Sequence, residues 1–165
     1  MEPDARCGQM AAAAPRPLAE VLQCPPPIAS LLSSAARRLS FDPGEAVFLQ
    51  SGNCRGLYLV VSGQFQRRSE RAETQFVLGP ARTGDLVELA AALAGGRHAY
   101  TLSARTFGSA ILLPIEELQR AFQEYPPLRM QLLMELAREV SRGYVASCDV
   151  RISRPRREGR EVPGR

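Results

Sequence analysis

The stretch that decides the fold runs from Gly79 to Ala104 and reads GPARTGDLVELAAALAGGRHAYTLSA. Glycines flank a short apolar run that is too rich in alanine for a strand, and alternating residues follow it. This pattern favours a turn, a short helix, a second turn and a strand. Such a unit in a β-patterned chain can direct backbone N–H groups and a helix N-terminus towards an anion. The stretch therefore predicts a phosphate-binding loop.

Short strands with glycine punctuation surround this stretch. The expected strands are 46–50, 57–61, 64–68, 74–78, 100–103 and 109–113. We expect 57–61 and 64–68 to form a hairpin around Ser62-Gly63, and the strand 74–78 to end at Gly79-Pro80. Closely spaced short strands favour a roll, because closure hides the edges that an open sheet exposes. The predicted fold is α+β, with a small antiparallel β-roll (double-stranded β-helix, jelly-roll-like) at 41–113.

Helical patterns flank the roll. Short helices are expected near Leu18 and from Ile28 onward, with Arg37 and Arg38 in the last turn of the second, where cations suit the helix dipole. After the roll, Pro114 opens one helix and the Pro126-Pro127 pair opens a longer one. The longer helix carries an i, i+4 apolar stripe made of Leu128, Leu132, Leu136, Val140 and Tyr144. This stripe packs either on the roll or on a second chain.

These patterns divide the chain into three parts. We expect a disordered N-terminus at 1–17, a folded domain at 18–148 with its C-terminal helices at 114–148, and a disordered arginine-rich tail at 149–165. The first residues lack the basic start and apolar length of a signal peptide. No apolar run reaches the roughly 18 residues that span a bilayer. The expectation is therefore a cytoplasmic protein that does not interact with membranes.

Composition excludes several kinds of chemistry. All 21 basic residues are arginine, so the chain has no lysine that could form a Schiff base. The net charge of +4 comes from the arginines of 151–165, which favours a solvated tail over a nucleic-acid-binding face. His98 is the only histidine, which argues against a metal-dependent enzyme. The scattered cysteines predict free thiols and no metal site. They are Cys7, Cys24, Cys54 and Cys148.

The order of these parts resembles the cyclic-nucleotide-binding domain of the catabolite-activator (Crp/Fnr) family of transcription regulators. The resemblance covers roughly Leu18 to Tyr144. It rests on FDPGE at 41–45, Gly52, LYLVVSG at 57–63, GDL at 84–86, and Pro114 followed by two helices. It implies a β-roll with a phosphate-binding cassette, and a cyclic nucleotide (cAMP or cGMP) or another small molecule as the ligand. It also implies a homodimer paired through the long C-terminal helix.

In binding members of the family the cassette has Gly-Glu-Leu, followed about nine or ten residues later by an arginine and a small residue. Counting from both borders of the stretch places Glu88 at the glycine, Leu89 at the glutamate, His98 at the arginine and Ala99 at the small residue. A one-residue shift instead makes Glu88 the ribose acceptor and Arg97 the phosphate clamp. We favour the unshifted register, because a shift would turn the following strand inside out. In that register Glu88 repels a phosphate, so the usual binding of a cyclic nucleotide is not expected.

Each candidate also has a plain structural interpretation. Arg97 fits a solvated loop residue, His98 a surface or hydrogen-bonded histidine, and Glu88 a residue that flanks the short helix. The residues proposed for dimerisation are Leu132, Leu133, Leu136 and Val140.

Three functions follow from these alternatives. The first is a non-catalytic ligand-sensing module related to transcription regulators, and the second is a structural or dimerisation module without a ligand. The third is a truncated DNA-binding regulator. Because no helix-turn-helix is recognisable after the long helix, we expect no sequence-specific DNA binding by this chain alone.

Overall fold

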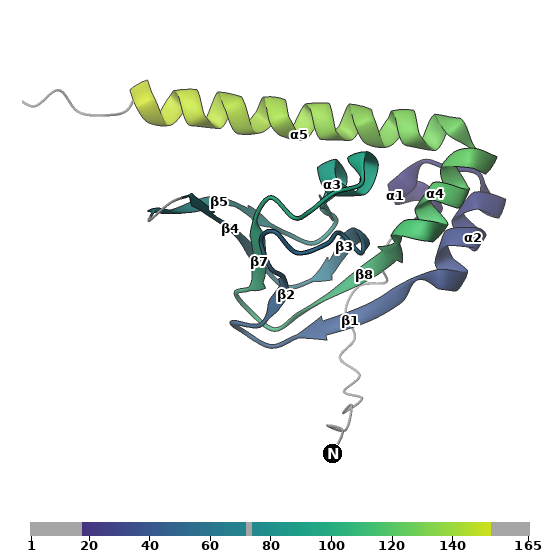
Figure 1. Ribbon diagram of the computed structural model, residues 1–165, viewed down its shortest axis with the longest axis horizontal. Helices are drawn as coiled ribbons and strands as arrows, with labels where there is room; N and C mark the ends of the chain where they lie inside the picture. The colour runs from purple at the N-terminus through teal and green to yellow at the C-terminus, as the bar shows by residue number, and fades with distance from the viewer. Residues whose placement is uncertain (1–17, 72–73, 153–165) are drawn as a thin grey trace, which may run out of the picture.

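The computed structural model describes residues 18–71 and 74–152, which form a β-roll with helices at one end and along one side (Figure 1). The strands are β1 (Arg37–Phe41), β2 (Ala46–Phe48), β3 (Gly56–Ser62), β4 (Phe65–Arg71), β5 (Thr74–Ala81), β6 (Leu86–Val87), β7 (Thr101–Ala104) and β8 (Gly108–Pro114). The helices are α1 (Leu18–Leu22), α2 (Pro26–Ala35), α3 (Leu89–Ala94), α4 (Ile115–Glu124) and α5 (Pro126–Ile152). The expected α+β roll is confirmed.

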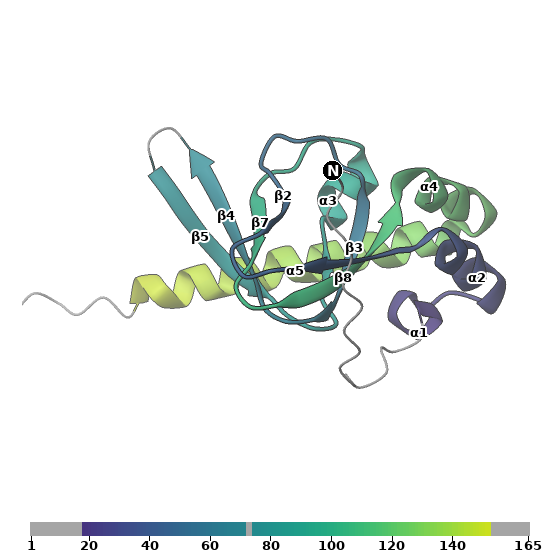
Figure 2. The same cartoon turned by 90° about the horizontal axis from the view of Figure 1, so that it is seen from below.

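Two four-stranded antiparallel sheets form the roll, and Figure 2 shows them from below. The strand orders are β1-β8-β3-β6 and β2-β7-β4-β5. The short helix α3 follows β6 directly, so the chain leaves one sheet, forms the helix and enters the other sheet at β7. We call the segment between β5 and β7, residues 82–100, the cassette segment. Its helix is the one that the alanine-rich run predicts.

Buried apolar side chains form two clusters. One cluster fills the roll and includes Phe48, Tyr58 and Phe65. The other lies between the roll and the helices and includes Leu32, Leu118 and Leu128, with contributions from α3. Side chains of this size stabilise the folded state by about 1.5–3 kcal/mol each when they are buried. The cassette segment borders both clusters, since Val87 belongs to the first and Leu89 to the second.

The expected hairpin of 57–61 and 64–68 is wrong. The strand β3 pairs with β6 and β8, whereas β4 pairs with β5 and β7 in the other sheet. The Ser62-Gly63 corner therefore carries the chain from one sheet to the other. Gly63 has a φ of +85°, and a Cβ there would stand 2.6 Å from the Phe107 carbonyl oxygen. The corner is thus packed closely against the β7–β8 turn.

Arg37 and Arg38 begin strand β1 and do not lie in the last turn of α2, which corrects the expected helix boundary. Ala36 is extended, with ψ at 138°, and its N–H caps the helix on the Ser33 carbonyl oxygen. From Arg37 onward the backbone pairs with β8. Pairing with β1 satisfies the backbone hydrogen-bonding groups along one edge of β8. This gain outweighs the weak preference of two arginines for the C-terminal end of a helix dipole.

The ends of β5 and α5 also differ from expectation. The strand β5 continues through Gly79 and Pro80 to Ala81, where it pairs with Phe65, so the turn falls later, at 82–85. The helix α5 extends to Ile152. The tail expected at 149–165 therefore begins within a helix, and its remaining residues, like the expected disordered segment 1–17, lie outside the described residues. Within the described part of the chain, no helix combines the length and the apolar character needed to cross a membrane.

Candidate ligand-binding site

Glu88 occupies the junction between β6 and α3. Its neighbour Val87 pairs with Tyr58 of β3, so the sheet holds the start of the cassette segment. Glu88 itself has φ 74° and ψ 28°, the left-handed conformation that glycine adopts most readily. The residue is only 5% exposed. Its carboxylate is therefore held inside the protein by a backbone conformation that costs roughly 1–2 kcal/mol for a residue with a Cβ.

His98 is held by the loop that follows β2. Its N–H donates to the Gly52 carbonyl oxygen at 2.9 Å, and the Ser51 N–H donates to the His98 carbonyl oxygen at 2.8 Å. The imidazole stacks on the Phe48 ring, with centroids 4.0 Å apart and planes inclined by 15°. The side chain is buried. Both its backbone and its ring are thus fixed by neighbours from the loop and from β2.

Glu88 and His98 contact each other directly. His98 Nδ1 donates a hydrogen bond to Glu88 Oε2 at 2.8 Å, and both side chains are almost fully buried. A carboxylate and an imidazole buried without partners would each carry a large desolvation cost, which this contact offsets. Tyr100 lies close to this pair. Burial raises the pKa of its phenol, and the negative charge of Glu88 raises this pKa further.

Cys54 is the third polar side chain of this cluster. Its N–H donates to the Gly96 carbonyl oxygen at 3.0 Å, so the same loop that holds His98 also holds Cys54. One donor atom from each of Cys54, Glu88 and His98 lies within 4.8 Å of the other two. Burial raises the pKa of the Cys54 thiol. We call these three residues the Cys54–Glu88–His98 cluster.

The other cassette residues proposed from the sequence do not join this cluster. Leu89 is buried in the core between the roll and the helices. Arg97 and Ala99 are exposed, and the backbone of Arg97 forms an isolated bridge with Asn53. The structure thus brings together Glu88 and His98 and leaves Arg97 at the surface.

Sequence reasoning missed Cys54 and Phe48. It treated the cysteines as unclustered because they are far apart along the chain, yet the roll brings Cys54 beside Glu88 and His98. The sequence offered one signal, the glycine at position 52, two residues before Cys54. A glycine there suits a loop that packs closely against its neighbours. A Cβ on Gly52 would stand 3.0 Å from the Leu49 carbonyl oxygen and 3.5 Å from His98 Cδ2.

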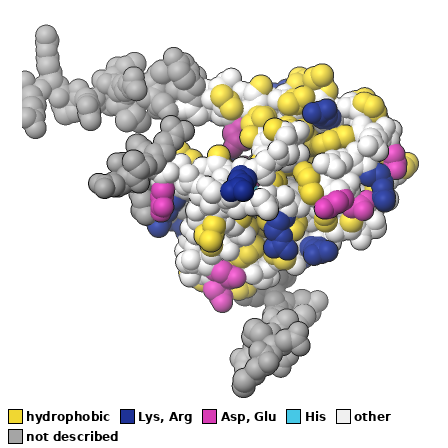
Figure 3. Space-filling model, viewed as in Figure 1, with side chains coloured by type: hydrophobic (Ala, Val, Ile, Leu, Met, Phe, Trp, Pro, Cys, Tyr) yellow, Lys and Arg dark blue, Asp and Glu magenta, His cyan; other side chains and the backbone are white. Residues whose placement is uncertain are grey.

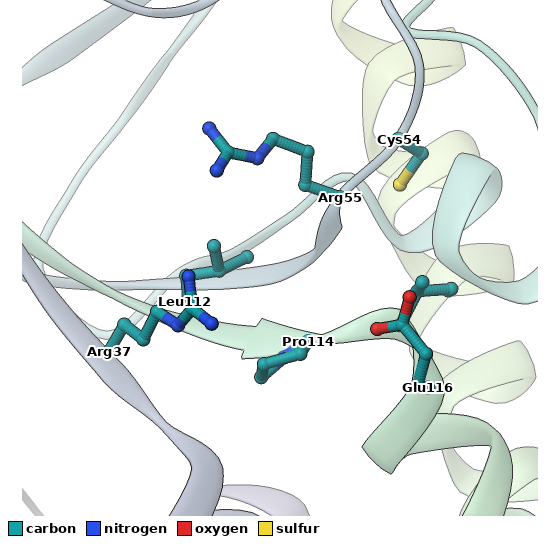
Figure 4. A pocket seen from close by; sticks show the side chains of 7 residues that line it. Arg37, Cys54, Arg55, Leu112, Pro114 and Glu116 are labelled. Atoms are coloured by element: carbon teal, nitrogen blue, oxygen red, sulfur yellow. The ribbon is translucent and has the colours of Figure 1, made fainter.

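Cys54 also contributes to the lining of a cavity of about 270 Å³. Figure 4 shows the Cys54 sulfur beside it, with the Arg55 and Arg37 side chains on one side and Glu116 at the start of α4 on the other. Cys54 therefore borders both this cavity and the buried Glu88–His98 pair.

The four residues proposed for dimerisation fall into two groups. Leu132 is 4% exposed and Leu136 is partly buried, and both pack on the protein's own core. Leu133 and Val140 are 40% and 64% exposed. They share an outer face of α5, and apolar side chains gather along that helix in Figure 3. This outer face comprises Met130, Leu133, Met134, Ala137 and Val140.

The chain thus combines a two-sheet roll, a short helix after β6 that packs between the roll and α5, and a long C-terminal helix. The chain belongs to the cyclic nucleotide-binding domain family, whose model matches residues 38–125. The expected cyclic-nucleotide-binding domain is thereby confirmed. The matched family is a regulatory binding domain and not a catalytic one.

Solved structures share this fold. The sensor domain of the transcriptional regulator DNR from Pseudomonas aeruginosa is 20% identical with a TM-score of 0.65, over 76% of this chain and 83% of that one. The catabolite activator protein of Thermus thermophilus is 22% identical with a TM-score of 0.65, over 76% of this chain and 59% of that one. The c-di-GMP-responsive regulator CLP of Xanthomonas campestris is 18% identical with a TM-score of 0.65, over 78% of this chain and 65% of that one. These likenesses concern the fold.

One curated relative is an enzyme. The lysophospholipase NTE1 of Eremothecium gossypii is 29% identical over 105 residues, which are 62% of this chain and 7% of that protein. The chain thus spans a small fraction of this relative.

Proposed function

We propose that this protein is a non-catalytic sensor or regulatory module whose cassette does not hold a cyclic phosphate in the usual way. The observation that carries the proposal is the buried hydrogen bond between Glu88 and His98. An incoming phosphate would meet the Glu88 carboxylate, and like charges repel strongly in a buried site.

The backbone supports the register on which this proposal rests. Glu88 has the left-handed conformation that suits glycine, as the unshifted register requires of the residue at the glycine position. His98, at the arginine position, is buried and committed to Glu88, whereas Arg97 is exposed. In the shifted register Arg97 would have to turn inward to reach a phosphate.

Calorimetric titration with cAMP and with cGMP tests the proposal. We expect no saturable heat from either nucleotide with the wild-type protein, and the same result with Arg97→Ala. The matched control is Arg82→Ala, which removes another exposed arginine of the cassette segment. Saturable heat that is lost in Arg97→Ala and kept in Arg82→Ala would overturn the proposal, because it would establish Arg97 as a phosphate clamp.

A second candidate function, a dimerisation module, is favoured by the exposed outer face of α5. Met130, Met134 and Val140 are each at least half exposed. Apolar side chains at this spacing along one helix face are typical of a helix that pairs with another. The two functions are compatible, since the cassette and this face lie on different elements. The expectation that this chain alone does not read a DNA sequence stays a prediction.

A further inference from the structure

We propose that Cys54, Glu88 and His98 form a binding site for a divalent transition metal ion, with Zn²⁺ as the best fit. This inference goes beyond the proposed function and does not depend on it. It also departs from the sequence-based expectation of no metal site, which rested on the distance between the cysteines along the chain.

The donor set suits zinc. Zinc in proteins is bound by thiolate, imidazole and carboxylate, and sites with three protein ligands keep a fourth position for water. A thiolate and a carboxylate together carry two negative charges, so a divalent cation makes the site neutral. Neutralisation favours the metal-bound state in a buried site, where isolated charges are costly. Softer and harder cations fit this mixed donor set less well.

The geometry is close to what zinc requires. Zinc–ligand bonds of about 2.0–2.3 Å in a tetrahedron put the donor atoms about 3.3–3.6 Å apart. The three donor atoms here lie within 4.8 Å of one another. Side-chain shifts of about an ångström would bring them onto one ion. The Glu88–His98 contact, at 2.8 Å, would open slightly to admit it.

The surrounding structure holds the donors in place. The loop at 51–54 is hydrogen-bonded to 96–98, so the backbone holds Cys54 and His98 beside each other. The Phe48 ring fixes the plane of the imidazole. Supporting contacts of this kind orient metal ligands and raise affinity. Two of the three ligands, Cys54 and His98, are therefore held in place before the metal ion binds.

The cavity beside Cys54 supplies an entry path, which any metal site needs. Arg37 and Arg55 make one side of its lining positive, and Glu116 adds a carboxylate on the other. The arginines repel an approaching cation, so we expect slow loading. Titrations should accordingly be read after equilibration. Binding must also displace the proton of the Cys54 thiol.

Titration with Co²⁺, followed by displacement with Zn²⁺, tests the site. Cobalt reports a thiolate ligand through charge-transfer absorption and a tetrahedral site through intense visible bands. The full chain is used after chelator treatment under reducing conditions, with Cys7 and Cys148 replaced by serine so that two thiols are left. We expect about one equivalent of Co²⁺ with thiolate absorption, which Zn²⁺ abolishes.

Matched variants in this background assign the ligands. Cys54→Ser should lose the thiolate absorption and weaken binding by at least about 100-fold, since even changes to supporting residues cost 10- to 100-fold. His98→Gln and Glu88→Gln should weaken binding to a similar degree. The control Cys24→Ala removes the other described thiol, which is buried in the helical core, and should bind cobalt like the background protein. Absence of thiolate absorption at saturating cobalt, or its survival in Cys54→Ser, would overturn the proposal.

A measurement without ligand variants guards against misfolding. The alkylation rate of Cys54 is measured by mass spectrometry with and without Zn²⁺. At a zinc concentration ten times the dissociation constant, we expect about tenfold protection of Cys54. Equal alkylation of Cys54 with and without zinc would refute the site.

Discussion

Gly63 and Gly84 show how one backbone conformation can have two different reasons. Both have φ near +90°, at 85° and 92°. A Cβ on Gly63 would stand 2.6 Å from Gly108 Cα and from the Phe107 carbonyl oxygen, whereas nothing lies within 4 Å of a Cβ on Gly84. Gly84 is needed for its dihedral angles alone, and Gly63 for both its dihedral angles and its lack of a side chain.

Alanine substitutions separate these two effects. We expect Gly84→Ala to lower the free energy of unfolding by about 1–2 kcal/mol, the cost of a left-handed residue with a Cβ. Gly63→Ala should lower it by at least about 3 kcal/mol, because crowding against the β7–β8 turn adds to the same strain. Urea denaturation followed by circular dichroism measures both. Equal losses would show that the corner relaxes and that close packing there is unimportant.

Among the elements, α5 is tied to the roll by Arg67 of β4. An Arg67 Nη atom lies 3.2 Å from a Glu139 carboxylate oxygen, and its guanidinium lies 5.9 Å from the centre of the Tyr100 ring. Another Nη donates to the carbonyl oxygens of Gly79 and Pro80. Burial raises the pKa of Glu139 despite the attraction of Arg67. Arg67 therefore joins β5, the cassette segment and α5.

Arg67→Met should loosen the part of α5 that follows Glu139. A partly exposed ion pair contributes about 0.2–1 kcal/mol, so amide hydrogen exchange there should accelerate by up to about fivefold. The control Arg68→Met changes the next residue of β4, which is exposed. Acceleration of the same size in both variants would mean that the strand, and not the ion pair, supports the helix.

The positions of the helices and strands were easier to predict than which strands pair with one another. The alanine run of α3 and the prolines at the starts of α4 and α5 are local signals, and local signals decide whether a helix forms and where it begins. The Ser62-Gly63 turn is equally local, but it says only that the chain changes direction and not which sheet accepts β4. The pairing of β3 with β8 depends on residues far along the chain, which no turn residue encodes.

The same reasoning explains the candidate site. Glu88 and His98 were found because both lie in one segment whose borders can be counted. Cys54 was missed because the loop that carries it meets that segment only after both sheets have formed. Arg97 was proposed because its charge suits a phosphate; the structure leaves it exposed, and its role as a clamp stays a prediction.

In the whole molecule, a series of contacting side chains links the cassette segment to α5. His98 stacks on Phe48, Phe48 contacts Tyr100, Arg67 lies over Tyr100, and Arg67 pairs with Glu139 of α5. Contacts alone do not demonstrate coupling, which requires two arrangements that both sites bias. The contacts form a continuous physical connection from the cassette segment to Glu139 of α5.

A charge on the outer face of α5 tests whether this face pairs two subunits. We expect the wild-type protein to sediment as a dimer and Val140→Glu to raise its dissociation constant at least tenfold. Burying a valine side chain in the interface contributes about 1.5–3 kcal/mol, and every 1.4 kcal/mol changes the dissociation constant about tenfold. A carboxylate in place of the valine must in addition be desolvated when the dimer forms. Analytical ultracentrifugation over a range of concentrations measures the change.

The control for this experiment is Phe107→Glu. Phe107 is 65% exposed and Val140 is 64% exposed, so both changes place a carboxylate where an exposed apolar side chain stood. Phe107 lies in the β7–β8 turn of the roll, away from α5, and its variant should dimerise like the wild type. A monomeric wild type, or equal weakening by both changes, would mean that the outer face of α5 does not pair two subunits. Weakening by Val140→Glu alone would assign the interface to α5, because only that change alters the helix face.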